Sequence, residues 1–242
     1  MSDRGQREKQ DRAQRDAARL AHARLKIWLA PSFPVGSFAY SHGLEKAVER
    51  GWIKNRATLE AWLHDLIAHG ALSNDLIILA VIWRAAHEQR WTDVASTAAL
   101  AAALQPSAER YLEATQQGAS FIDQINAAWP HAKPLWAEIA PDTVPTHAAA
   151  VGFATARHNI GLADTLDAYA NAFIGTLTSA AIRLSIIGQT DAQRIAAACL
   201  PALLAKAAAA ETATLDDLGS ATWASDLASL QHETQQTRLF RS

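Results

Sequence analysis

The chain has 242 residues, half of them hydrophobic, and 22 Lys and Arg against 24 Asp and Glu give it a formal net charge of −2. This near-neutral balance gives no electrostatic reason to expect a nucleic acid or an anionic membrane as a partner. The single cysteine, Cys199, excludes an intrachain disulfide framework and a zinc site with several thiolates, and its apolar neighbours predict a buried thiol.

Residues 1–19 are rich in Arg, Lys, Asp, Glu and Gln and lack the apolar core of a signal peptide. They predict a charged, flexible arm that frays or forms a solvated helix. No uninterrupted apolar run in the chain reaches the roughly 20 residues of a transmembrane helix. We therefore expect a cytoplasmic protein with this arm, an all-helical domain over residues 20–236 and a C-terminal interaction tail over residues 237–242.

Apolar residues at helical spacing begin at Leu20 and stop at Pro31, where two prolines and a glycine predict a loop over residues 30–37. Ser37 is the expected N-cap of a helix that runs to about Arg50, with Gly51 at its C-terminal end. Further helices are predicted over residues 55–69, 74–88, 92–104, 107–129, 146–159, 162–187, 190–210 and 222–236. Four prolines between Trp129 and Pro145 predict the longest irregular stretch.

No part of the chain shows the period-two alternation of β-branched residues that is typical of strands. Alanine, the strongest helix former, is abundant, and its small side chain lets helices approach closely. The sequence therefore predicts an all-α, single-domain bundle of about eight to ten helices with no sheet.

The common catalytic and nucleotide-binding motifs are missing from the sequence, including the P-loop, the dinucleotide-binding glycine pattern, the His-Glu-x-x-His zinc motif and the nucleophile elbow. Two histidines share a helix face when they are three or four residues apart, but the nearest pair, His64 and His69, is five apart. No paired carboxylates suggest acid–base catalysis. We predict no catalytic residue, no intrachain metal site and no enzyme activity, while a transient metal site shared across a protein interface stays open.

Residues 28–45 have the sequence WLAPSFPVGSFAYSHGLE, a rigid loop followed by a helix start. Gly43 is expected inside that helix, where it costs about 1 kcal/mol relative to alanine, so close approach of a second helix is its expected purpose. The segment resembles the hallmark of the UreF family of urease accessory proteins, a Phe-Pro-x-Gly loop followed by Ser-His/Gln-Gly-Leu-Glu. The matching residues, expected to be structural or at an interface, are Phe33, Pro34, Gly36, Ser41, His42, Gly43 and Glu45.

The C-terminal sequence HETQQTRLFRS resembles the closing His-Glu and Arg-Leu-Phe-x-Ser of the same family. Independently of that resemblance, two apolar anchors flanked by arginines have the form of a short linear binding element. The expected partner-binding residues are His232, Glu233, Arg238, Leu239, Phe240, Arg241 and Ser242. The alternative is a tail that docks on its own domain.

The resemblance implies an all-helical, non-catalytic adaptor that forms a homodimer in the nickel-insertion complex. Such proteins bridge a UreD (also called UreH) partner and the GTPase UreG, and the assembly acts on apo-urease. Nickel and nucleotide are then handled by the partner GTPase and urease, so no cofactor is expected for this chain. Whether it activates the GTPase or acts as a fidelity checkpoint stays open.

Three other interpretations compete with the family resemblance. The first is a generic all-helical protein-interaction scaffold unrelated to urease, which composition alone supports equally well. The second is a helical metalloenzyme with dispersed histidines, which requires three or more intrachain ligands around one metal ion. The third is a nickel store, which one cysteine and scattered histidines make a poor fit.

Overall fold

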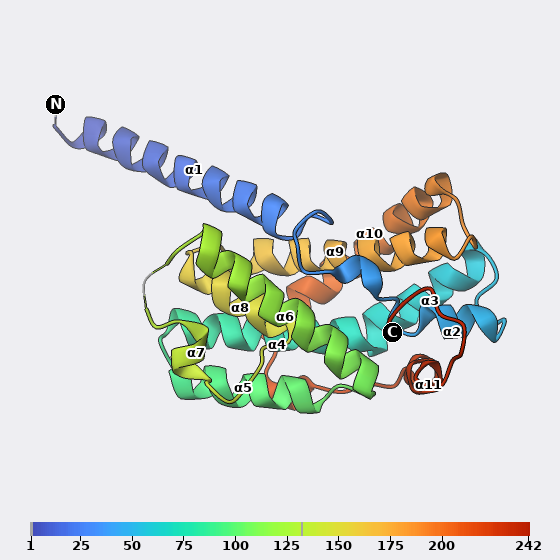
Figure 1. Cartoon of the computed structure of the whole chain (residues 1–242). Helices are drawn as coiled ribbons and strands as arrows, with labels where there is room; N and C mark the ends of the chain where they lie inside the picture. The colour runs from blue at the N-terminus through green and yellow to red at the C-terminus, as the bar shows by residue number, and fades with distance from the viewer. Residues whose placement is uncertain (1, 132) are drawn as a thin grey trace.

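The computed structural model describes residues 2–131 and 133–242, with residues 2–8 and 11 described by their backbone alone. The chain folds into α-helices α1 (Ser2–Trp28), α2 (Leu44–Glu49), α3 (Arg56–His69), α4 (Ala71–His87), α5 (Trp91–Ala103), α6 (Ala108–Ala128), α7 (Trp136–Ile139), α8 (His147–Arg157), α9 (Leu162–Arg183), α10 (Gln189–Ala210) and α11 (Trp223–His232), with 3-10 helices η1 (Ser37–Ala39) and η2 (Leu215–Asp217) (Figure 1). No strand occurs in the described ranges, so the all-α, single-domain prediction is confirmed. In the described residues, the short helix α7 lies within the stretch that was predicted to be irregular.

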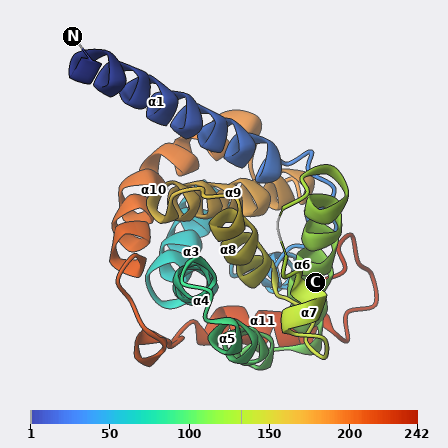
Figure 2. The ribbon, with the colours of Figure 1, turned by 90° about the vertical axis from the view of Figure 1, so that its left-hand side faces the viewer.

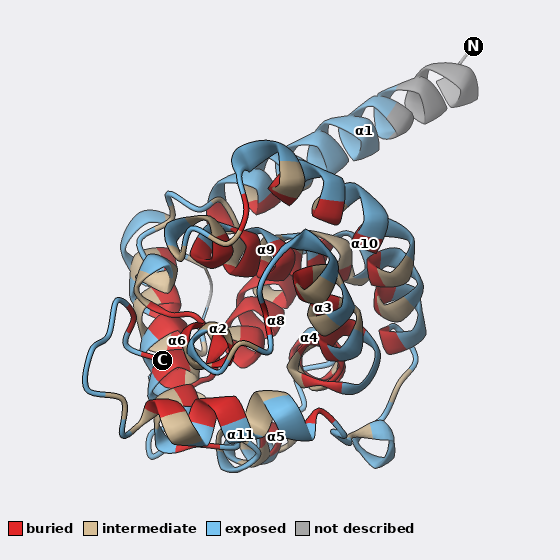
Figure 3. Cartoon of the chain, turned by 90° about the vertical axis from the view of Figure 1, so that its right-hand side faces the viewer, coloured by how far each residue is buried: buried red, intermediate tan, exposed pale blue. Residues whose placement is uncertain are grey.

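The centre of the bundle is the contact between α4 and α8. Leu72, Leu76 and Leu79 of α4 are fully buried, as expected for a helix that is apolar over most of its circumference. Gly152 of α8 allows the two backbones to approach, because a Cβ at this position would lie 2.5 Å from the carbonyl oxygen of Leu79. Figure 2 shows α8 surrounded by the other helices, and Figure 3 shows their buried residues turned inward.

One stretch, Arg56–His87, is long and apolar enough to cross a membrane by length and composition alone. It comprises α3 and α4, and 61% of its most apolar window is buried inside the fold. Core helices of globular proteins have the same composition, and burial of this stretch against α8 and α10 accounts for its hydropathy.

The predicted helix from Ser37 to Arg50 is wrong, because the chain is broken twice over this range. The 3-10 helix η1 ends at Ala39, and α2 begins only at Leu44. His42 and Gly43 between them have φ angles of +56° and +75°, in the left-handed region that an α-helix does not contain.

Gly43 therefore precedes α2 instead of lying inside a longer helix. The expected close helix approach is nevertheless present, since a Cβ on Gly43 would lie 2.8 Å from the backbone nitrogen of Ser229 in α11. Gly51 has a φ of +72° directly after α2, in agreement with its predicted role at the end of the helix.

The N-terminal segment continues as one helix into the domain, so residues 2–19 of the predicted arm and the first predicted helix are parts of α1, while residue 1 lies outside the described residues. Leu25 and Trp28, in the last turns, are buried against the domain. Figures 1 and 2 show the preceding turns projecting away from the other helices.

Candidate partner-binding site

The C-terminal tail folds back onto its own domain and ends beside α2 (Figure 1). The backbone N–H of Arg241 donates to the carbonyl oxygen of Ala39 at 2.8 Å, and the N–H of Ser41 donates to that of Ser242 at 2.8 Å. The Ser41 hydroxyl donates to the same Ser242 oxygen. The two segments that carry the family resemblance are therefore in direct contact, as in the alternative of a tail docked on its own domain.

Glu45, in the first turn of α2, holds the tail by its backbone. Its carboxylate accepts the N–H of Leu239 at 2.7 Å and the N–H of Phe240 at 2.9 Å. The same carboxylate faces Nε2 of the fully buried His232 at 3.3 Å. A hydrogen bond to a carboxylate is stronger than one between two neutral groups. The Glu45 carboxylate therefore contributes strongly to the stability of the docked tail.

Glu113 of α6 is a second buried carboxylate that binds the tail, at its last residue, Ser242. It contacts Nε2 of His42 at 2.8 Å and Nη1 of Arg110 at 2.6 Å, and it accepts the Ser242 hydroxyl at 2.8 Å. Burial by itself raises the pKa of the Glu113 carboxyl, but the Arg110 guanidinium, His42 and the Ser242 hydroxyl outweigh it and lower the pKa to about 2. Glu113 is thus an anion at neutral pH, with hydrogen-bond partners from three parts of the chain.

The first turn of α6 completes the network. Glu109 contacts Nδ1 of His232 and Nη1 of Arg238, each at 2.6 Å. Glu233 accepts the backbone N–H of Ala108 at 2.9 Å, which satisfies one of the free donors at the start of α6. Anionic side chains are favoured at a helix N-terminus, so the position of these carboxylates also stabilises α6.

The Phe240 ring fixes the remaining side of the tail. Only 3% of Phe240 is exposed, and the Arg183 guanidinium lies 4.3 Å from its ring centroid, a cation–π geometry. Arg183 also donates a hydrogen bond to the backbone oxygen of Phe38 in η1. One arginine of α9 therefore positions both the tail and the loop before α2.

The predicted family-motif residues divide into two groups. Ser41, Gly43 and Glu45 contact α11 or the tail, and His42 contacts Glu113 of α6, which in turn binds the tail. Phe33, Pro34 and Gly36 are in the preceding loop: the Phe33 ring packs 5.3 Å from that of Phe121, Pro34 is exposed, and Gly36 turns the chain into η1 with a φ of +77°.

The predicted partner-binding residues also divide into two groups. His232, Phe240 and Ser242 are buried in the intramolecular contacts, and Glu233 is partly buried. Arg238, Leu239 and Arg241 are exposed, with 52% of Leu239 accessible. Partner binding by this tail stays a prediction, and in this conformation only the exposed group offers its side chains to another molecule.

Several important residues were not predicted from the sequence. Glu109, Arg110 and Glu113 resemble an ordinary solvated helix face, and Arg183 resembles a helix-end cation. Phe38 is 75% exposed beside the tail, although a hydrophobic residue in a loop is usually assumed to pack inward. Only the Arg110–Glu113 spacing of three residues gave a local signal that two of these groups could pair.

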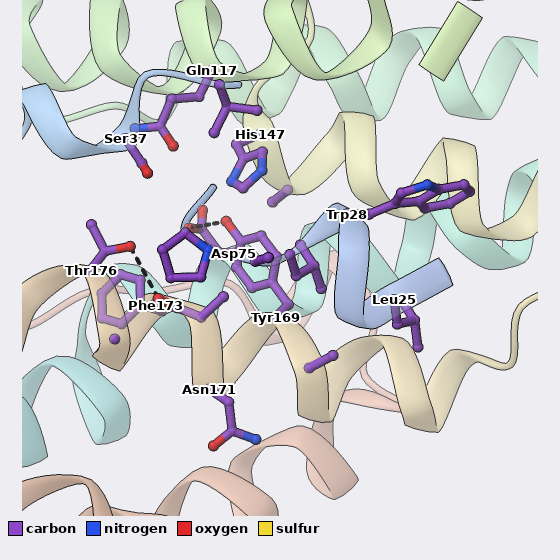
Figure 4. Close-up of a pocket in the computed structure, with 18 of the residues that line it drawn as sticks. Leu25, Trp28, Ser37, Asp75, Gln117, His147, Tyr169, Asn171, Phe173 and Thr176 are labelled. Atoms are coloured by element: carbon purple, nitrogen blue, oxygen red, sulfur yellow. Dashed lines mark hydrogen bonds between the residues drawn. The ribbon is translucent and has the colours of Figure 1, made fainter. Parts of the chain in front are cut away.

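A cavity of about 500 Å³ lies between α1, α6, α8 and α9 (Figure 4). The Tyr169 hydroxyl donates to Asp75 at 2.9 Å, and the His147 ring lies 5.5 Å from the Tyr169 ring. Burial raises the pKa of Asp75 to about 6 and lowers the pKa of His147 to about 4. His42 and Glu113 also line the cavity, so its wall is continuous with the network that holds the tail. Among the side chains that the structure describes, no group of three His, Cys, Asp or Glu has the arrangement of a metal site.

Comparisons with known proteins extend the resemblance beyond the two motif segments. A family model described as UreF matches residues 53–200, a range that contains neither segment. The chain is 48% identical over 228 residues to a protein named Urease accessory protein UreF from Rhodopseudomonas palustris (strain BisA53), covering 93% of this chain and 96% of the relative. Proteins of the same name from Bradyrhizobium diazoefficiens and Methylobacterium radiotolerans are 48% and 45% identical, covering 96% and 93% of this chain and 95% and 99% of those relatives.

Proposed function

Because the chain belongs to the UreF family of urease accessory proteins, we propose that it is a non-catalytic adaptor in the complex that inserts nickel into urease. It bridges a UreD (UreH) partner and the GTPase UreG, and it modulates GTP hydrolysis or the delivery of nickel to apo-urease. Nickel is the cargo of the complex, and this chain contributes surfaces and works in the cytoplasm as a homodimer.

The docked tail is the observation that carries this proposal. Three buried or largely buried carboxylates, Glu45, Glu109 and Glu113, hold it in one conformation. A segment that is already ordered loses less conformational entropy on binding than a free tail does. Leu239 and Arg241 are exposed on the tail, and Phe38 is exposed on the segment that binds it, while Arg238 is held by Glu109. Together they offer apolar and cationic groups to a partner with an apolar pocket and carboxylates.

The polar side chains around the tail bind other groups of the same chain, which supports an adaptor in preference to an enzyme. His42, His232 and the three carboxylates donate to or accept from other groups of the same chain. A general acid or base has to reach the substrate, whereas these groups contact the backbone and side chains of the tail. Their chemistry is therefore structural, and function depends on the surface that they support.

The test is co-purification of the tagged chain with UreD and UreG from the same source, followed by size exclusion. Truncation after Gln236 removes the buried Phe240 and Ser242 as well as the exposed side chains, so a substitution at the surface is cleaner. Leu239→Ser is the test variant, and Leu200→Ser on α10, where the leucine is 41% exposed, is its matched control.

We expect a three-protein complex with the wild-type chain and with Leu200→Ser, and at least about tenfold weaker retention with Leu239→Ser. Retention by both variants would place the contact away from the tail. The absence of any complex, with UreD and UreG shown to be competent, would contradict the adaptor function itself.

A further inference from the structure

His232, in the last turn of α11, is fully buried between two carboxylates. Its Nδ1 lies 2.6 Å from Glu109 of α6, and its Nε2 lies 3.3 Å from Glu45 of α2. α11 packs against both of these helices, close to the C-terminus (Figure 1). Both carboxylates also bind the tail, so the ring connects two groups that hold the last residues of the chain.

The two contacts of the ring require a proton on each of its nitrogens. A neutral imidazole has one N–H and one lone pair, and a lone pair that faces a carboxylate is repelled by it. The carboxylates are already acceptors of other bonds: Glu45 accepts two backbone N–H groups of the tail, and Glu109 accepts Arg238. The geometry therefore fits an imidazolium that donates to both carboxylates.

Charged residues surround this ring on α2, on α6, on the tail and on α11 itself. They are Glu45, Lys46, Glu49 and Arg50 of α2, Glu109, Arg110 and Glu113 of α6, Arg238 and Arg241 of the tail, and Asp226 and Glu233 beside the ring in sequence. Lys46 pairs with Glu49, and Arg110 pairs with Glu113. Around the ring itself, Glu45 and Glu109 face the guanidinium of Arg238 alone if the ring is neutral, and two cations if it is charged.

His42, the other histidine near the tail, has a different environment. It contacts one carboxylate, Glu113, at 2.8 Å, and its ring packs edge-on against Phe173 with 5.2 Å between the centroids. Burial lowers the pKa of His42, and the nearby Arg110 charge lowers it further. One N–H of a neutral ring is enough for a single carboxylate, so a change of charge linked to the tail is assigned to His232.

We propose that His232 is a pH-sensitive switch of the C-terminal tail: the imidazolium bridges Glu45 and Glu109 and keeps the tail docked, and loss of one ring proton to solvent releases the tail. The nitrogen that loses its proton then directs a lone pair at a carboxylate, so the bridge opens on that side. Because the docked tail binds one proton more than the released tail, docking weakens as the pH rises, by up to about tenfold per pH unit.

The consequence for partner proteins rests on the proposed function. The docked tail holds Leu239 and Arg241 in fixed positions on the surface, and a released tail has to be ordered again before it binds. Partner binding through these side chains should therefore weaken as the pH rises. The switch itself is a property of this chain and is measured without a partner.

The test is amide hydrogen exchange of residues 239–241 in the full chain, from about pH 5.5 to about pH 8.5, the interval in which histidine ordinarily changes its charge. These three N–H groups bond to Glu45 and Ala39 when the tail is docked. Rates are corrected for intrinsic exchange at each pH. Amides of α8, in the centre of the bundle, report global unfolding and separate it from release of the tail.

Glu109→Gln is the diagnostic variant. The glutamine amide can donate to an unprotonated Nδ1 while Nε2–H donates to Glu45, so a neutral ring is satisfied in this variant. We expect tail protection that hardly changes with pH, lower than in the wild-type chain at the acidic end of the range and higher at the alkaline end. A loss of packing alone would lower protection at every pH and would not produce this crossing.

Arg238→Gln is the matched control. It removes the other partner of Glu109 but leaves both contacts of the His232 ring. We expect weaker protection of the tail throughout, with the dependence on pH retained. His232→Gln should lose the dependence on pH and be less protected than the wild-type chain at the acidic end.

In the wild-type chain we expect tail protection to fall at least about tenfold across the range, with α8 protected throughout. Nitrogen NMR shifts of His232 should show both ring nitrogens protonated while the tail is docked. Tail protection independent of pH, a wild-type slope in Glu109→Gln, or a neutral His232 ring in a docked tail would each overturn the inference. Co-purification with UreD and UreG at one pH does not depend on this slope, so failure of the switch and failure of the adaptor function are distinguishable.

Discussion

The Glu45 carboxylate accepts the backbone N–H of Phe240 at 2.9 Å, although the two residues are 195 positions apart in the chain. This bond joins the most distinctive segment near the N-terminus to the last residues of the protein. The tail is therefore part of the folded domain, and a substitution in either segment acts on both.

Replacing Glu45 with alanine should release the tail. The substitution removes the acceptor for two backbone N–H groups and a contact of His232, so we expect a loss of about 2–4 kcal/mol in the free energy of unfolding. Urea unfolding measures the loss, and faster amide exchange of residues 239 and 240 localises it. Glu49→Ala, at an exposed position of the same helix, is the control and should change stability by less than about 0.5 kcal/mol. Equal losses for the two variants would show that Glu45 does not fasten the tail.

Gly43→Ala separates steric contact from backbone strain. Gly43 and Gly36 have nearly the same φ, +75° and +77°, but a Cβ at Gly43 meets the backbone of Ser229 at 2.8 Å whereas nothing lies within 4 Å at Gly36. Gly36→Ala should therefore cost about 1 kcal/mol for the left-handed conformation alone, and Gly43→Ala about 2 kcal/mol more. Thermal and urea unfolding of both variants give the comparison. Similar costs would mean that α11 moves away without penalty.

Phe240 and its neighbour Leu239 should show opposite behaviour. Phe240→Ala empties a buried site beneath the Arg183 guanidinium, with an expected cost of about 3 kcal/mol in unfolding free energy. Leu239→Ala, at a half-exposed position, should cost less than about 1 kcal/mol yet weaken retention of the partner proteins. Urea unfolding and co-purification are measured on both variants. A stability loss for Leu239→Ala as large as that for Phe240→Ala would contradict the division into a buried and an exposed side of the tail.

Asp75 should make the domain less stable as the pH rises. Burial raises its pKa to about 6 from an ordinary value of 3.8, so its contribution to stability is complete below about pH 4 and is lost as the pH rises through 6. Asp75→Asn avoids ionisation and should raise the free energy of unfolding by about 2–3 kcal/mol at pH 8, with little gain at pH 4. Asp123→Asn, on the exposed face of α6, is the control for the Asp-to-Asn replacement itself. An equal effect of Asp75→Asn at both pH values would mean that packing, and not ionisation, is responsible.

Local signals in the sequence predicted most of the helices. Prolines, caps and apolar spacing act over one or two turns, so α3, α5, α6 and α8 begin and end within a few residues of their predicted limits. The prediction failed between Ser37 and Arg50, where Ser41 bonds to Ser242 and the chain passes through two left-handed residues. A partner some 200 residues away decides the backbone there, and no local pattern contains it.

The sequence by itself determined the all-α fold class, and its two resembling segments indicated the UreF family, because composition, periodicity and motifs are properties of the chain. Only the tertiary structure decided that these segments bind each other, which side of the tail is buried, and that Glu109, Arg110, Glu113 and Arg183 hold it. Charged residues on helix surfaces have the same local pattern whether they face solvent or a buried carboxylate. Their role depends on distances across the fold, and packing alone sets those distances.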